Sequence, residues 1–378
     1  MSSIAVNAIT DANGGSTTSI NSVTPNTSNV VGKNRIIGGD FTTNPWQRGT
    51  SFAAIAHPSY SADRWRAAYV TSAVVTASKA ADAPTASQAG VFTQDCLSLA
   101  VTTADTSIAA SDFFLNGQFI EGLNAASFGF GQAGSRNVTL SFWVKGTKTG
   151  IHCVSIANSA ANRSYVAEYT IVASNTWEYK TITIPVDTSG TWLYDTGIGV
   201  RLNFMLMAGT NFHATANTWT AGTYTATANQ VNALDSTANT FKIALVQLEA
   251  GSSATEFEHR QYGTELALCQ RYYYNHVEGN NRFIGMGDFY VGSQANVGIN
   301  FPVTMRTSPT LDQTYGTSYY FIYGGAANGA VSNSWTVFLS QPNGAFLFVQ
   351  PTYSGTPGHA IRVRTYNASA SLSFNAEL

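Results

Sequence analysis

Residues 241–274 read FKIALVQLEAGSSATEFEHRQYGTELALCQRYYY, and this stretch changes character twice. Its first part, Phe241–Leu248, is almost continuously apolar, as expected of a buried strand. A Gly-Ser-Ser turn and a charged segment follow, and Thr264–Arg271 has the apolar spacing of a short helix with Thr264 as its N-cap. We therefore expect this stretch to end one folded unit and to lead into another.

The chain before this stretch predicts a large β-sandwich. Apolar and polar residues alternate with a period of two, typical of strands with one face in a core, over 138–144, 182–186 and 198–206. Turn formers such as Gly146 and Gly190 separate these segments. Several short strands joined by loops rich in Gly, Ser and Thr favour a jelly-roll β-sandwich over residues 34–262, with 241–248 as its last strand.

The chain after the stretch predicts a second, smaller β-sandwich over residues 275–378, joined to the first by a short helical linker at 263–274. Alternating segments recur at 297–301, 335–339, 361–365 and 372–378. The last segment has the clearest alternation, with Leu372 and Phe374 on one face and Ser371 and Ser373 on the other. The predicted fold class is therefore all-β.

Residues 1–33 differ from the rest of the chain because they contain few large apolar side chains and several turn formers. Alone, such a segment could not offset the entropy lost on ordering, so a floppy tail is one interpretation. Scattered aliphatic residues favour the other, an extended arm ordered by docking on a partner: Ile4, Val6, Ile9, Ile20 and Val23.

Composition narrows the possible functions. Apolar residues make up 44% of the chain, enough for real cores, whereas only 11% of residues are charged. Low charge suits surfaces that become interfaces, and a net charge of -2 argues against nucleic-acid binding. The sequence contains no run of 18 apolar residues, so we expect no segment that crosses a membrane. The N-terminus lacks the pattern of a signal peptide, so we expect synthesis in a cytoplasm.

No motif points to an enzyme. The Gly-x-Ser-x-Gly elbow, His-Glu-x-x-His, the phosphate-binding loop and the dinucleotide fingerprint are missing, and the six histidines form no ligand-spaced cluster for a zinc-type metal. Acidic pairs such as Asp40 with Asp63, or Glu256 with Glu258, could flank a sugar, but we interpret them as turn caps or surface charge. Buried free thiols are predicted for Cys96, Cys153 and Cys269.

Several phrases resemble bacteriophage tail-fibre and related virion appendage proteins. Residues 39–65, with Gly-Asp-Phe, Trp-Gln-Arg-Gly-Thr-Ser-Phe and Tyr-Ser-Ala-Asp-Arg-Trp, are similar to the start of the carbohydrate-binding-module-like jelly roll in such fibres. Residues 245–260 and 265–273 resemble its end and the link to a distal domain, and 301–310 resemble a phrase of that domain. Residues 9–21 are similar to short attachment segments of phage proteins.

The resemblance implies a homotrimeric, non-enzymatic fibre tip of the virion that docks on another tail or baseplate protein through residues 1–33. Its distal domain would bind host surface polysaccharide, and several weak sites on one particle gain ~10²–10⁴ in apparent affinity. Host lysis would release such a particle without a signal peptide. Two alternatives stay open: a tailspike-like polysaccharide depolymerase, and a fibre that is only structural or decorates the capsid.

Candidate glycan-binding residues come from the distal domain, because sugars bind flat aromatic faces and because loops on rigid sandwiches carry binding sites. The candidates flank the loops at 324–329 and 353–359, and a core or interchain position is the alternative for each tyrosine. They are Tyr319, Tyr320, Tyr323, Tyr353 and His359.

Other candidates lie in the linker and in the first sandwich. The short helix is a predicted meeting place of chains or domains through Leu266, Leu268 and Cys269. Trp46 and Trp65 are expected to pack the end of the first sandwich, with ligand stacking as the alternative. Asp40 lies where related jelly rolls place a structural calcium ligand, but its expected acidic partner is here Gln247-Leu-Glu249, so no cofactor is predicted.

Overall fold

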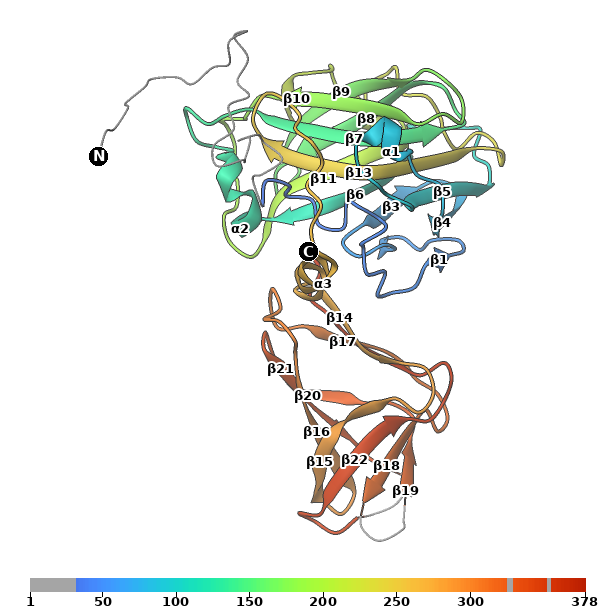
Figure 1. Cartoon of the computed structure of the whole chain (residues 1–378), viewed down its shortest axis with the longest axis vertical. Helices are drawn as coiled ribbons and strands as arrows, with labels where there is room; N and C mark the ends of the chain where they lie inside the picture. Colours follow the sequence, from blue (N-terminus) through green and yellow to red (C-terminus); the bar gives the residue numbers. More distant parts are fainter. Residues whose placement is uncertain (1–31, 325–328, 352–354) are drawn as a thin grey trace, which may run out of the picture.

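The computed structural model describes residues 32–324, 329–351 and 355–378 (Figure 1). The predicted arm lies outside the described residues except for Gly32 and Lys33, and so does Tyr353. Over the described ranges the chain is all-β, as predicted, and its one helix longer than a single turn is α3 (Tyr262–Gln270). No helix of these ranges combines the length and apolar character needed to cross a membrane.

Two antiparallel sheets face each other in the first unit, as the jelly-roll prediction requires. The first sheet has the order β1 (Ser51–Phe52), β4 (Val74–Ala80), β5 (Cys96–Thr103), β13 (Thr240–Ala250), β7 (Val138–Gly146), β10 (Glu178–Ile184). The second has the order β12 (Trp219–Ala221), β9 (Arg163–Ile171), β8 (Gly150–Ala157), β11 (Ile198–Ala208), β6 (Phe113–Glu121), β3 (Arg66–Val70), β2 (Ser59–Tyr60). The predicted closing strand is therefore central, because β13 pairs with both β5 and β7.

The core between these sheets follows from the period-two alternation. In β11, Leu202 and Phe204 are fully buried in the main hydrophobic cluster, and Asn203 between them lies on the opposite face of the sheet. Trp65 is also fully buried, with its ring centroid 5.2 Å from that of Phe41, and its indole N–H donates to a backbone carbonyl. Trp46 is 5% exposed, so both tryptophans pack the sandwich and neither ring is available for ligand stacking.

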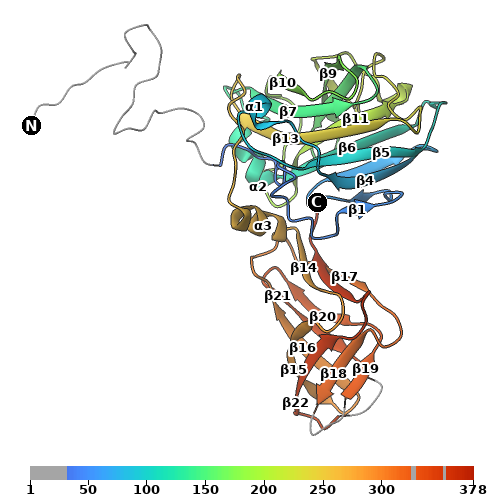
Figure 2. The same cartoon turned by 45° about the vertical axis from the view of Figure 1, so that its right-hand side comes forward.

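The second unit has its own core between a small and a large antiparallel sheet (Figures 1 and 2). The small sheet has the order β14 (Tyr273–Glu278), β23 (Ser371–Asn375), β17 (Thr310–Thr314). The large sheet has the order β19 (Gly329–Ser332), β18 (Tyr320–Gly324), β22 (Ala360–Thr365), β15 (Phe283–Val291), β16 (Gln294–Asn300), β21 (Gly344–Val349), β20 (Thr336–Gln341). One predicted face is wrong: a register shift after Val337 leaves Leu339 51% exposed.

The N-cap of helix α3 lies three residues earlier than the sequence predicts. Gln261 occupies the N-cap position with an extended backbone and makes no side-chain capping hydrogen bond, whereas Thr264 lies inside the helix. The helix start is held instead by Glu265 in its first turn, whose buried carboxylate accepts a hydrogen bond from the backbone N–H of Gly38. A long-range contact, rather than a local cap, therefore sets where this helix starts.

Charged side chains join the two sandwiches. Arg48 lies 3.3 Å from the carboxylate of Asp63 in its own sandwich and 3.2 Å from that of Glu377 near the C-terminus. Arg271, at the end of α3, forms a 2.6 Å ion pair with Glu121, which is 1% exposed. The two units are thus fixed to each other by buried carboxylates, and Figure 2 shows the C-terminus returning to the first sandwich.

The three cysteines are buried free thiols, as predicted. Burial raises the pKa of Cys96 to about 12, so this thiol stays neutral and unreactive at physiological pH. Cys269 belongs to a small apolar cluster that also contains Ile37 and Tyr272. Leu268 and the C-terminal Leu378 pack against the same cluster, so α3 is a meeting place of the two units, one of the two alternatives that the sequence predicts.

Replacing Phe204 by Ala tests the core of the first sandwich. The ring is fully buried, 5.0 Å from the ring of Phe142, so its removal should lower the free energy of unfolding by about 3–5 kcal/mol. Denaturant titration followed by tryptophan fluorescence measures the change. Val172→Ala is the matched control, because Val172 is 73% exposed and its truncation should cost little. A Phe204→Ala cost no larger than the control's would contradict this core.

Candidate functional site

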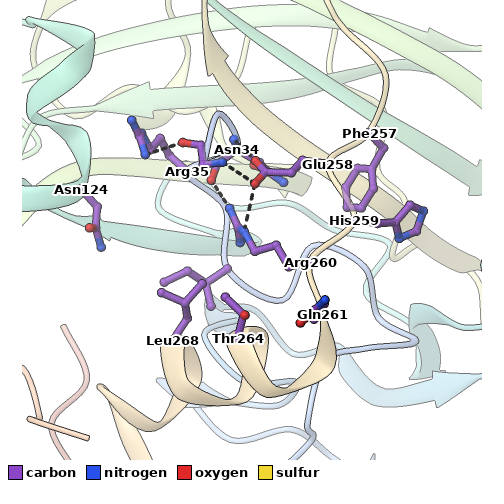
Figure 3. Close-up of a pocket in the computed structure, with 12 residues that line it drawn as sticks. Asn34, Arg35, Asn124, Phe257, Glu258, His259, Arg260, Gln261, Thr264 and Leu268 are labelled. Atoms are coloured by element: carbon purple, nitrogen blue, oxygen red, sulfur yellow. Dashed lines mark hydrogen bonds and ion pairs between the residues drawn. The ribbon is translucent and has the colours of Figure 1, made fainter. Parts of the chain in front are cut away.

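A cavity of about 700 Å³ lies where the chain enters and leaves the first sandwich (Figure 3). It lies between the segment that begins at Gly32, the segment 257–261 and the first turns of α3. Its lining is mixed, with apolar side chains such as Ile37 and Leu268 beside Arg35 and Arg260. Size alone would make it the first candidate for a binding site.

The charges around this cavity already bind each other. Glu258 accepts hydrogen bonds from the backbone N–H groups of Gly32 (2.6 Å) and Asn34 (2.7 Å). Arg260 forms ion pairs with Glu258 (3.7 Å) and Glu265 (3.4 Å) and donates to the backbone carbonyls of Asn34 and Ile36, as the dashed lines in Figure 3 show in part. The cavity is therefore first of all a structural joint.

A second candidate lies on the outer face of the large distal sheet. In β22, Ile361 and Val363 are buried in the distal core, so the intervening Arg362 and Arg364 lie on the opposite, solvent-facing side. Cross-strand pairing places Phe321 and Phe283 on either side of Arg364. The alternation of β22 thus presents two cations between neighbouring aromatic strands.

Aromatic rings lie against both guanidinium groups. The guanidinium carbon of Arg362 lies 4.7 Å from the ring centroid of Tyr323. That of Arg364 lies 5.2 Å from Phe321, 5.4 Å from Tyr323 and 5.0 Å from Tyr366, and its Nε donates a 2.9 Å hydrogen bond to the hydroxyl of Tyr323. We call the set the aromatic–arginine face, which consists of Phe283, Phe321, Tyr323, Arg362, Arg364 and Tyr366.

The aromatic–arginine face is open and hollowed. A groove of about 300 Å³ is lined by Asn281, Phe283, Tyr323 and residues 362–364, and the ring of Phe283 is 59% exposed. Within the described residues, neither arginine forms an ion pair with a carboxylate. Flat apolar rings beside free guanidinium donors can bind the faces of sugar rings together with their hydroxyl or carboxylate oxygens.

The structure separates the predicted glycan-binding residues. Tyr323 belongs to the aromatic–arginine face, whereas Tyr320 is fully buried and donates to the carbonyls of Thr314 and Ser371, so its prediction is wrong. Tyr319 is partly buried against the distal core. His359 is exposed next to the start of β22, and Tyr353 lies outside the described residues.

The glycan-binding residues predicted from the sequence did not include the arginines of this face. The alternation that puts Ile361 and Val363 in the core also exposes Arg362 and Arg364, so the signal was present in the same segment. The residues of α3 predicted for assembly differ in burial. Leu266 and Leu268 are half-buried, and Cys269 is buried inside its own chain.

The acidic residues considered for a calcium site make local contacts. Asp40 accepts hydrogen bonds from the Thr42 N–H (3.2 Å) and the Thr93 hydroxyl (3.0 Å), while Glu249 accepts from Thr255 (2.9 Å). No group of three or more potential metal ligands occurs in the described part of the chain.

The comparisons with known proteins are remote. No family model and no curated protein matches the chain. The enzymatically active domain of tailspike protein 4 of bacteriophage CBA120 aligns with 57% of this chain and 21% of its own at 14% identity and a TM-score of 0.32. The chain thus spans about a fifth of that structure.

Two carbohydrate-binding modules also align. TmCBM61, in complex with β-1,4-galactotriose, aligns over 58% of this chain and 99% of its own at 11% identity and a TM-score of 0.28. The family 11 module of a Clostridium thermocellum cellulosomal cellulase aligns over 54% and 97% at 14% identity and 0.27. At such scores the function has to be argued from this chain's own residues.

Replacing Glu258 by Gln tests the structural role of the large cavity. The change removes the charge that binds Gly32 and Asn34 and faces Arg260, and it should lower the free energy of unfolding by about 1.5–3 kcal/mol. Amide hydrogen exchange should become faster at residues 32–38. Glu256→Gln is the control, because its exposed carboxylate has no partner in the described structure. Equal exchange in both variants would contradict this role.

Proposed function

We propose that this chain is a bacteriophage tail-fibre adhesin that binds host cell-surface glycan through the aromatic–arginine face. One observation carries the proposal: Arg362 and Arg364 lie among exposed rings on a solvent-facing sheet and have no carboxylate partner in the described residues. The strands that bear this face lie in the part of the molecule away from the first sandwich (Figure 1). A tip position suits a group that must reach a cell surface.

The first sandwich and the segment at Gly32 serve attachment in this proposal. Glu258 binds the backbone at Gly32 and Asn34, and Lys33 donates to the carbonyl of Glu256, so a segment preceding residue 32 would leave from a firmly held point. We propose that residues 1–33 dock on another tail or baseplate protein of the virion. A pull on the arm would then be transmitted directly to the sandwich.

We further propose that three copies of the chain assemble. The large distal sheet ends in β21 and β20, at the edge away from the strands β18 and β22 that carry the aromatic–arginine face. These two end strands expose Phe338 (69%), Leu339 (51%) and Phe346 (36%). The ring centroids of Phe338 and Phe346 are 6.1 Å apart, so the exposed apolar side chains are contiguous. Contiguous exposed aromatic residues mark interaction surfaces, and several copies would also strengthen weak sugar binding through effective concentration.

A depolymerase of the tailspike kind is the alternative. The six residues that define the aromatic–arginine face include no carboxylate, whereas glycoside hydrolysis commonly uses a facing pair of them. The adhesin proposal therefore predicts binding without cleavage. Release of reducing ends from a bound polysaccharide would contradict the adhesin proposal and support the depolymerase.

The combined replacement of Tyr323 and Arg362 by Ala tests glycan binding. Loss of a ring face and of a charged hydrogen-bond donor should weaken binding on a glycan array by about tenfold or more. Labelled full-length protein is the probe, and thermal unfolding confirms that the variant is folded. Tyr179→Ala is the control, because Tyr179 is 46% exposed on the first sandwich. Unchanged binding by the double variant would overturn this site.

Replacing Phe338 and Phe346 by Ser tests assembly. Sedimentation equilibrium should give the mass of three chains for the unaltered protein and a lower mass for the variant, because the exposed apolar contact is lost. Val172→Ser removes an apolar group of similar exposure from the first sandwich and should leave the trimer intact. A monomeric unaltered protein would refute the assembly proposal but not glycan binding.

A further inference from the structure

A pair of arginines on the first sandwich has no role in the proposal above. Arg201 on β11 and Phe119 on β6 are cross-strand partners, and Arg66 on β3 pairs with Gly117 two residues along β6. Phe114 and Ile120 of β6 belong to the core, so Phe119 points to the opposite, outer face of the sheet. Arg66, Phe119 and Arg201 therefore meet outside the sandwich, distant in sequence but adjacent in the sheet.

Both arginines lie against the same aromatic ring. The guanidinium carbon of Arg66 is 4.7 Å from the ring centroid of Phe119, and that of Arg201 is 4.6 Å from it. The ring itself is only 6% exposed. Cation–π attraction can fix the orientation of both guanidinium groups, but it does not neutralise either charge.

The two arginines differ from the buried arginines nearby. Arg48 faces Asp63 and Glu377, whereas Arg66 and Arg201 form no ion pair with the described residues. Arg201 donates two hydrogen bonds to the carbonyl of Ser159, at 3.0 and 2.6 Å, and the guanidinium of Arg66 has no hydrogen-bond acceptor among them. An anion would supply Arg66 with the acceptor that the described residues do not provide.

The electrostatics point the same way. Burial lowers the pKa of Arg66, and burial together with the nearby charge of Arg66 lowers the pKa of Arg201. The two cations thus repel each other in a partly desolvated place. An anion bound between or beside them would relieve both effects, whereas water alone relieves them only in part.

The surroundings are neutral and polar. Gly117 lies between Arg66 and Asn203 in the register, and Asn203 pairs with Ser155 and donates a 3.2 Å hydrogen bond to its hydroxyl. Phe119, Asn203 and Ser155 are each at most 6% exposed, so a ligand would meet the half-buried guanidinium groups of Arg66 and Arg201 and not these side chains. An acidic sugar would be held here through its carboxylate, which is the group that guanidinium cations bind.

We propose that Arg66 and Arg201 form an anion-binding subsite on the first sandwich that takes the carboxylate of an acidic sugar. Planar guanidinium groups bind carboxylates through two parallel hydrogen bonds. This subsite uses residues of a different sandwich from the aromatic–arginine face and stands or falls independently of it. The chain would then bind an acidic polysaccharide at two separated places.

Isothermal titration of the full chain with carboxylated oligosaccharides tests the subsite. The probes are short oligomers containing galacturonate, glucuronate or sialate, together with the same oligomers after reduction of their carboxyl groups. The chain carrying Tyr323→Ala and Arg362→Ala serves as the background, so that binding at the distal sandwich does not hide the result. We expect at least one carboxylated probe to bind and its reduced form to bind about tenfold or more weakly.

Arg66→Gln combined with Arg201→Gln should abolish this binding, and Arg136→Gln should not, because Arg136 is an exposed cation elsewhere on the same sandwich. Thermal unfolding checks that each variant is folded. The proposal is overturned if no carboxylated probe binds, if reduced probes bind equally well, or if the double variant retains affinity. Equal binding of tetraglutamate would also overturn it, by assigning the pair to a protein carboxylate.

Discussion

The buried ion pairs around Arg260 are the constraint on which the rest of the structure depends. Glu258, Arg260 and Glu265 connect the segment that enters the first sandwich to the segment that leaves it and to α3. None of these charges could be removed alone without leaving another uncompensated in a poorly hydrated place. The first sandwich, the linker and the helix therefore form one joint, and this joint fixes where the second sandwich begins.

A second set of charges fixes the direction of the distal unit. Glu121 of β6 binds Arg271 at the end of α3, and the hydroxyl of Tyr272 donates a 2.6 Å hydrogen bond to the same carboxylate. Glu377 returns from the C-terminus to Arg48. With both ends of the distal unit held, its large sheet cannot swing freely, and such rigidity would suit the multivalent glycan binding proposed for the aromatic–arginine face.

The sequence predicted the strands because alternation is local, and it failed where contacts are long-range. Thr264 is a good local N-cap in sequence, yet the observed helix start is held by Glu265, which accepts a hydrogen bond from Gly38, 227 residues away along the chain. Tyr320 looks like its neighbour Tyr323 in sequence, but the inward face of β18 buries it. The pairing of Arg66 with Arg201 depends on β3 and β11 flanking β6, an order that the sequence does not encode locally.

Charged residues are scarce in this chain, so the surroundings of each cation indicate its role. Charged residues are 11% of the sequence, and arginines such as Arg48 and Arg271 that join the structure lie against carboxylates. The aromatic–arginine face and the Arg66–Arg201 pair instead place guanidinium groups on rings, which orient a cation while leaving its charge unneutralised. In the proposals above, a ligand supplies the partner that these guanidinium groups lack among the carboxylates of the described residues.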